Sequence, residues 1–278
     1  MFEITWCIIC YTTVLILEFA PVILQKFNLK GPIKLLKIIS IPVVIAGVLF
    51  STLHQSSFGS LYLIVPGKLH PLWYSSLLPV HFFISCVAAG LSMIIFESYL
   101  IARSCTKDQG FCNTGLKINI LSGAAFVVWI ALIAGLLLKI YDFVNNNKLH
   151  YLTMPSMETS LFYLEIFLGT IVPIVLLSNK KFREDKKWLY IISILVICGL
   201  ILNRLNVSIT GLVASSGINY FPSFDEISIT MMLVVLAIFA FKLMAKNFPV
   251  FVNEESEQAE NNSVPNESQQ IILSKQNE

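Results

Sequence analysis

The sequence predicts an all-α integral membrane protein, a bundle of about seven transmembrane helices. Its composition leads to this fold class, because 56% of the 278 residues are hydrophobic and only 13% are charged. A soluble domain normally carries about 25% charged residues. The net charge of +2 does not suggest nucleic acid as a partner. The lipid bilayer is therefore the first partner expected.

Seven apolar segments are long enough to cross a bilayer, for which a helix needs about 20 predominantly apolar residues. They lie at 4–25, 34–53, 75–101, 116–139, 158–178, 187–204 and 226–245. Prolines such as Pro21 and Pro42 are tolerated inside membrane helices. Residues 251–278 are rich in Glu, Asn, Gln and Ser and are expected to be disordered. The chain thus divides into a transmembrane bundle at 1–250 and a tail at 251–278.

The basic residues predict how the bundle is oriented. With seven spans, fifteen of the nineteen Lys and Arg residues fall on one side of the membrane. The other side receives four: Lys68, Lys139, Lys148 and Arg204. The positive-inside rule places the basic side in the cytoplasm. The amino terminus is therefore expected outside and the carboxyl terminus in the cytoplasm.

The stretch from Ser51 to His81 holds three of the four histidines, His54, His70 and His81. We expect residues 51–75 to form a loop on the outer side, between two spans. Many of its side chains are apolar and favour burial. Backbone at membrane depth has to be covered by protein or line a cavity. The loop is therefore predicted to fold back onto the outer end of the bundle as a lid.

Several stretches resemble a known family. Residues 54–73, HQSSFGSLYLIVPGKLHPLW, are similar to the membrane (b-type cytochrome) subunit of nickel–iron hydrogenases, in the wider polysulphide-reductase NrfD family. The same resemblance holds for 2–22, for FES at 96–98, for NRLNVS at 203–208 and for YFPSFDE at 220–226. It covers about residues 1–245.

The resemblance implies a quinone-reactive anchor of a respiratory redox complex in the cytoplasmic membrane of a bacterium. The implied partners are an outward-facing, ferredoxin-like iron–sulphur subunit and hydrogenase catalytic subunits. The implied substrate is a quinone such as menaquinone. Members of this family usually have about ten spans, so the chain is expected to correspond to one that lacks about three N-terminal helices.

Ionisable residues inside spans are costly and are therefore candidates for function. His54, His81 and Glu165 are expected near an outer-leaflet quinone, because quinol oxidation releases two protons that need acceptors. Three aromatic side chains are expected to wall the pocket: Tyr62, Trp73 and Tyr74. Alternatively, the histidines are interfacial hydrogen-bonding groups and the aromatic side chains form an ordinary membrane belt.

Other charged residues suggest a proton path and a docking surface. Glu18 and Glu97 lie toward the cytoplasmic ends of the first and third spans and are candidates for an inner proton path, or else they extend to the interface. His70, Arg204 and Asp225 are expected to contact a partner subunit. Arg204 alternatively pairs with Asp225 or Glu226 at the outer surface, or is a simple helix-end charge.

The cysteine and histidine patterns argue against a resident metal or haem. The six cysteines are scattered, and the C-x-x-C at Cys7 and Cys10 lies inside an apolar helix with no following His. A bis-histidine haem b needs two facing histidines. Since His54 and His81 are the sole candidates and both lie near the outer surface, haem b is not expected. Electrons are then exchanged with another subunit.

Two other functions remain open from the sequence. Seven spans with carboxylates inside them are compatible with a transporter or channel, although the chain has no internal repeat or matched pair of broken helices. The chain is alternatively an inactive fragment of the membrane subunit.

Overall fold

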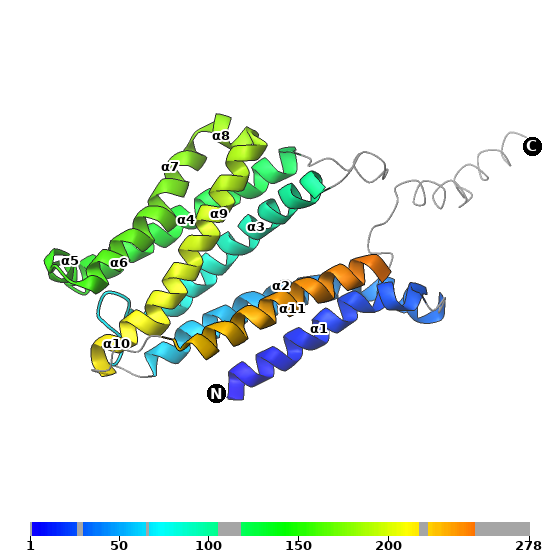
Figure 1. The fold of residues 1–278 in the computed structure, drawn as a ribbon, viewed down its shortest axis with the longest axis horizontal. Helices are drawn as coiled ribbons and strands as arrows, with labels where there is room; N and C mark the ends of the chain where they lie inside the picture. The colour runs from blue at the N-terminus through cyan, green and yellow to red at the C-terminus, as the bar shows by residue number, and fades with distance from the viewer. Residues whose placement is uncertain (1, 27–29, 65–66, 105–117, 217–221, 248–278) are drawn as a thin grey trace, which may run out of the picture.

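The computed structural model describes residues 2–26, 30–64, 67–104, 118–216 and 222–247, in which every regular element is a helix (Figure 1). The long helices are α1 Phe2–Lys26, α2 Lys30–Leu63, α3 Leu78–Ser104, α4 Ile118–Asn145, α9 Lys186–Leu205 and α11 Phe224–Asn247. The shorter ones are α5 Leu149–Thr153, α6 Met157–Ile166, α7 Val172–Ser178, α8 Lys180–Glu184 and α10 Gly211–Ser216. Two π-helical turns, η2 Phe167–Ile171 and η3 Asn206–Thr210, interrupt this order.

The predicted membrane bundle is confirmed. Within the described residues, six helical segments are long and apolar enough to span a bilayer. They are Thr5–Leu24, Ile38–Leu63, Leu78–Leu100, Ile118–Asn145, Met157–Ser178 and Lys186–Val213. The fifth runs through η2 and the sixth through η3. The seventh predicted segment, 226–245, lies within α11, whose side chains from Ile229 to Ala240 are exposed.

The predicted loop at 51–75 is half wrong, because α2 continues through its first thirteen residues to Leu63. Two of the hydroxyl side chains that made this stretch look like a loop form hydrogen bonds within the helix. Thr52 Oγ1 donates to the Val48 carbonyl at 2.9 Å, and Ser60 Oγ donates to the Ser56 carbonyl at 3.3 Å. Such bonds let hydroxyl side chains remain inside a helix at little cost.

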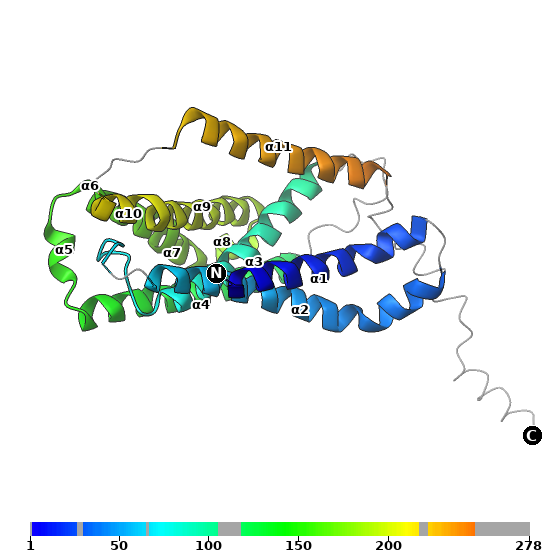
Figure 2. The same cartoon turned by 90° about the horizontal axis from the view of Figure 1, so that it is seen from below.

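Helix α3 is the centre of the bundle and packs against α2, α4 and α9. A buried apolar cluster joins α3, α4, α7 and α9; it includes Ile95, Leu121, Val128, Leu177, Ile192 and Val196. The hairpin of α1 and α2 runs along one side of the bundle (Figures 1 and 2). The only extensive packing of α1 is against α2, within the described residues.

The fifth and sixth spans touch at a glycine pair. A Cβ atom built on Gly169 would lie 2.6 Å from the Cα atom of Gly199, and one built on Gly199 would lie 2.2 Å from the Cα atom of Gly169. Real Cβ atoms do not approach backbone so closely, so both positions require glycine. This contact sets the separation of the helices that carry Glu165 and Asn206.

Candidate functional site

The connection between α2 and α3 folds back onto one end of the bundle, as the sequence predicted for part of it. We call residues 67–77 the cap, and the end that they cover the Trp73 end (Figure 1). Leu69, Leu72 and Trp73 are buried in a second apolar cluster. The His70 amide donates to the Gly211 carbonyl at 2.8 Å, which ties the cap to α10. The cap is thus part of the packed core.

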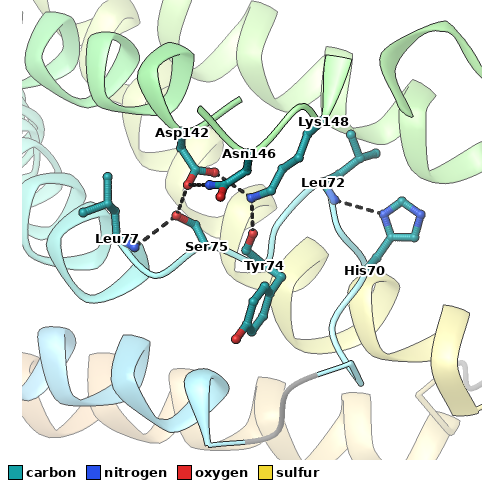
Figure 3. A network of polar contacts seen from close by, with 8 residues as sticks. All are labelled: His70, Leu72, Tyr74, Ser75, Leu77, Asp142, Asn146 and Lys148. Atoms are coloured by element: carbon teal, nitrogen blue, oxygen red, sulfur yellow. Dashed lines mark hydrogen bonds and ion pairs between the residues drawn. The ribbon is translucent and has the colours of Figure 1, made fainter. Parts of the chain in front are cut away.

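A buried ion pair anchors the cap to the end of α4 (Figure 3). Lys148 Nζ donates to Asp142 Oδ2 at 2.8 Å and to the Tyr74 carbonyl at 2.6 Å. Asp142 Oδ1 also accepts from Ser75 Oγ at 2.6 Å and from Asn146 Nδ2 at 2.8 Å. A buried pair is tolerated when its other hydrogen-bonding positions are filled in this way.

A second carboxylate, Glu165, joins four separate parts of the chain. Its Oε1 accepts from Lys139 Nζ of α4 at 2.8 Å and from Asn203 Nδ2 of α9 at 2.9 Å. Its Oε2 accepts from Trp73 Nε1 of the cap at 3.0 Å and from Asn206 Nδ2 of η3 at 2.9 Å. The carboxylate therefore receives four donors inside a membrane span.

Both π-helical turns lie beside this carboxylate. Glu165 lies two residues before η2, and Asn206 is the first residue of η3. A π-turn inserts an extra residue into a helix, shifts the side chains that follow, and is frequent at functional sites. Both turns therefore interrupt the fifth and sixth spans next to the point where Glu165 and Asn206 meet.

A small cavity of about 120 Å³ lies next to both ion pairs. Its polar lining comes from the cap, α3, α4, α6, η2 and α9: Ser75, His81, Ser85, Lys139, Asp142, Glu165, Thr170 and Asn203. His81 and Glu165, two of the predicted site residues, are thus brought to one cavity. Trp73 also lines it. A bulky ligand does not fit this volume, but water molecules and protons do.

A larger cleft of about 570 Å³ opens between α2, α3 and α9. Tyr62 and Arg204 line it, together with Gln55, Phe58 and Cys86. This cleft therefore holds Tyr62, which the sequence assigned to the pocket wall, away from the cavity beside His81.

Arg204 was predicted to face the surface, but its guanidinium turns inward. Its Cζ lies 3.4 Å from the centre of the Phe82 ring. Nη1 donates to Asn203 Oδ1 and Nη2 to Ser85 Oγ, both at 2.9 Å. No ion pair joins Arg204 to a carboxylate, including Asp225 and Glu226, in the part of the chain that the structure describes. Asp225 lies exposed in the first turn of α11.

The remaining predicted site residues lie elsewhere. His54 is part of α2 and contacts Phe58 edge-on at 4.7 Å; its Nδ1 is buried and has no hydrogen-bond partner among the described residues. Tyr74 takes part through its backbone carbonyl. Glu18 and Glu97 are exposed on α1 and α3, away from the Trp73 end.

His70 lies on the cap outside the predicted spans. Its Nδ1 accepts from the Leu72 amide at 3.3 Å, and its ring meets Trp73 and Tyr151 edge-on at 5.8 and 5.9 Å. Partial burial lowers the pKa of His70 below its ordinary value, although the nearby Glu158 carboxylate opposes this shift.

Sequence reasoning did not assign several residues to this site, among them Lys139, Asp142, Lys148, Asn203 and Asn206. The two lysines were counted only as charges on the less basic side of the membrane. Lys139 and Asp142 do carry a signal, since both are ionisable residues near the end of an apolar helix.

Comparison with known proteins places the chain in a family. Residues 2–216 match the family described as polysulphide reductase, NrfD. A protein of Nitratidesulfovibrio vulgaris is 33% identical over 253 residues, which cover 90% of this chain and 64% of the relative. No solved structure matches the chain.

Two further relatives carry informative names. The probable Ni/Fe-hydrogenase 2 b-type cytochrome subunit of Escherichia coli is 26% identical over 251 residues, covering 90% of this chain and 62% of that protein. The integral membrane subunit of the menaquinone reductase of Nitratidesulfovibrio vulgaris is 26% identical over 284 residues, covering 91% and 65%. The chain spans less than two thirds of the length of these relatives. Because the family match extends over most of its residues, the chain belongs to the polysulphide reductase NrfD family.

Proposed function

We propose that this chain is the quinone-reactive membrane subunit of a redox complex and passes electrons between an iron–sulphur partner and the quinone pool. The observation that carries the proposal is the polar cluster around Glu165, buried at the Trp73 end of an otherwise apolar bundle. Charged groups at such depth are expensive and mark ion or proton pathways. Relatives named for hydrogenase and menaquinone reductase complexes support the same reading.

The chemistry requires proton acceptors near the quinone. Oxidation of a quinol releases two electrons to the iron–sulphur partner and two protons, and the reverse reaction, reduction of a quinone, takes two electrons from the partner and takes up two protons. His81 faces the cavity that holds both carboxylates and is proposed to take a proton. Glu165 compensates Lys139 and orders water in the cavity. Trp73 lines the cavity from the cap side, and the Tyr74 carbonyl holds Lys148 beside it.

His54 is proposed as the second proton acceptor. It contacts Phe58, which lines the α2–α3–α9 cleft, and its buried Nδ1 has no protein partner among the described residues. A buried ring nitrogen that no protein group satisfies is available to a water molecule or a ligand.

The iron–sulphur partner is proposed to dock on the Trp73 end, where His70 and Asp225 lie partly or fully exposed. This end would face the outside of a bacterial cytoplasmic membrane, with the carboxyl terminus in the cytoplasm. A hydrogenase-type catalytic subunit would complete the complex. Glu18 and Glu97 lie toward the opposite end and are proposed to conduct protons there.

The test is electron transfer in the assembled complex, measured once with a quinone and once with an artificial dye that accepts electrons from the partner directly. His81→Ala is expected to lower quinone-linked turnover about tenfold or more while dye-linked turnover is retained, because general acid–base catalysis contributes roughly 10²–10⁴-fold. His150→Ala, an exposed histidine of α5, is the matched control and should change neither rate.

The outcome decides between two readings. Equal quinone-linked rates in wild type and His81→Ala would contradict the role of His81. Loss of both the quinone-linked and the dye-linked rates would indicate failed assembly, which comparison of subunit ratios in the purified complex identifies.

A further inference from the structure

We infer that the quinone ring itself binds in the cleft between α2, α3 and α9, with Arg204 and Tyr62 as its hydrogen-bond donors. This inference rests on the proposed function and gives that function a location. The cavity next to His81, at about 120 Å³, is too small for a substituted naphthoquinone, whereas the cleft, at about 570 Å³, has the size of an ordinary ligand site.

Arg204 has donors to spare and, among the described residues, no carboxylate within ion-pair distance. A guanidinium carries five N–H groups, and this one bonds to Asn203, Ser85 and, at 3.4 Å, the Phe82 carbonyl. An unpaired cation inside a membrane helix is costly, so an acceptor brought by a ligand is expected to stabilise it.

The depth of Arg204 favours a quinone over a phospholipid headgroup. Its contact Ser85 lies seven residues beyond the start of α3 at Leu78, which corresponds to about 10 Å along the helix. A lipid phosphate belongs to the headgroup region outside the hydrocarbon core. A quinone ring is neutral and apolar, carries carbonyl acceptors, and is soluble at that depth.

The cleft walls suit a flat apolar ring with two polar atoms. Phe58, Met93 and Leu200 provide apolar contact, and Gly90 leaves open space in the wall. Tyr62 adds a hydroxyl to the donors of Arg204. A cation next to a carbonyl also stabilises the negative charge that builds up when the ring accepts electrons from the partner.

A continuous chain of hydrogen bonds connects the cleft to the buried cluster. Arg204 donates to Asn203 Oδ1, and Asn203 Nδ2 donates to Glu165 Oε1, which also accepts from Lys139. The charge of the ring is therefore linked to the Glu165–Lys139 pair through one amide side chain.

The test uses two cysteines of the native chain. Cys86 lines the cleft, whereas Cys198 is exposed on α9 and does not line it. The full chain, purified in detergent, is labelled with N-ethylmaleimide in the presence of increasing 2,3-dimethyl-1,4-naphthoquinone, and labelling of both peptides is followed by mass spectrometry. The quinone is expected to protect Cys86 in a saturable manner and to leave Cys198 unchanged.

Two glycine variants show whether the cleft itself is responsible. A Cβ atom on Gly90 or on Gly123 meets no atom within 4 Å, so a larger side chain is accepted at both positions. Gly90→Leu projects into the cleft and is expected to abolish protection, whereas Gly123→Leu, exposed on α4, is expected to preserve it. Arg204→Gln is expected to weaken quinone binding tenfold or more, since it removes a charged donor.

The outcomes separate this inference from the proposed function. Quinone-linked turnover in the complex without any protection of Cys86 would overturn the cleft as the ring site and leave the function standing. Protection by phosphatidylglycerol instead of the naphthoquinone would also overturn it, in favour of an anionic lipid. Absence of both turnover and protection would contradict the function as well.

Discussion

The two buried lysine–carboxylate pairs of the Trp73 end have the same geometry and different consequences. Lys139–Glu165 and Lys148–Asp142 both have an N–O distance of 2.8 Å and carboxylates that are only 5% exposed. The second pair joins residues six apart, at the end of one helix, and fixes the cap. The first joins residues 26 apart and collects donors from the cap, α9 and η3 as well. One pair anchors a local turn, and the other holds the whole end of the bundle together.

Removal of Glu165 is expected to produce the largest effect of any change in these pairs. Glu165→Ala removes the one acceptor that four donors share, and leaves the partly buried Lys139 without its partner and three neutral donors unsatisfied, so it should destabilise the protein by about 3–5 kcal/mol. Thermal unfolding in detergent measures this loss. Glu97→Ala removes an exposed carboxylate from a span and should hardly change the midpoint. Similar midpoints for both variants would show that Glu165 is not the centre of this cluster.

Asp142→Ala should cost less, about 1–3 kcal/mol, because Lys148 keeps its bond to the Tyr74 carbonyl and only two neutral donors, Ser75 and Asn146, lose their acceptor. The damage should also be local. Hydrogen exchange of the cap amides, especially Leu77 beside Ser75, should accelerate, while exchange in α3 and α9 stays slow. Acceleration throughout the bundle would contradict the assignment of this pair as a local anchor.

A feature of this structure could be predicted from the sequence when the residues that form it are close together in the chain, and could not when they lie in different helices. The helices and the burial of Leu69, Leu72 and Trp73 follow from apolar runs, which are local. The hydroxyl-rich part of α2 was misjudged because Ser and Thr look alike in a loop and in a helix that satisfies them internally. The partner of Glu165 could not be predicted, since Lys139 lies in another span and the π-turns that align them leave no pattern in the sequence.

The orientation of Arg204 was also not predictable, because residues far away in the chain determine it. Its position near the end of an apolar run suggested a surface charge, and Asp225 was the first acid after it in the chain. The structure shows that Ser85 and Phe82, about 120 positions away, determine its orientation. Contacts between helices thus decide which charges face a cleft, whereas composition decides only that such charges are few.

A smaller effect is expected from the indole of Trp73. Trp73→Phe keeps an aromatic ring in the cap and removes only one of the four donors to Glu165, at a cost of about 1 kcal/mol. Trp129→Phe is the matched control, because the indole of Trp129 donates to a neutral carbonyl, that of Ile174, at 3.2 Å. The Trp73 variant should unfold at the lower temperature of the two. The reverse order would show that the bond to the carboxylate contributes little.

The smallest expected effect concerns pH and acts on the cap alone. The Nδ1 atom of neutral His70 accepts a hydrogen bond from the Leu72 amide. The His70 ring also makes edge-on contacts with Trp73 and Tyr151. Protonation would turn this acceptor into a donor. Burial lowers the pKa of His70 while the cap is packed on the bundle. His70 therefore binds a proton more readily when the cap is detached and the ring is exposed to water. Closing of the cap is therefore fully favoured above the ordinary histidine pKa of about 6.5 and weakens as the pH falls below it.

Hydrogen exchange of the cap amides between pH 7.5 and about pH 5.5, a range that brackets the ordinary pKa of histidine, tests this linkage after correction for the intrinsic rate. Exchange should accelerate modestly toward the acid end, since Glu158 stabilises the imidazolium and offsets part of the effect. His70→Phe should remove the pH dependence, because it retains an aromatic ring and has nothing to protonate. His150→Phe, which replaces an exposed histidine on α5, should keep it. If the His70 variant retained the dependence, another group would control the cap, and the Asp142–Lys148 anchor beneath it would be the next to examine.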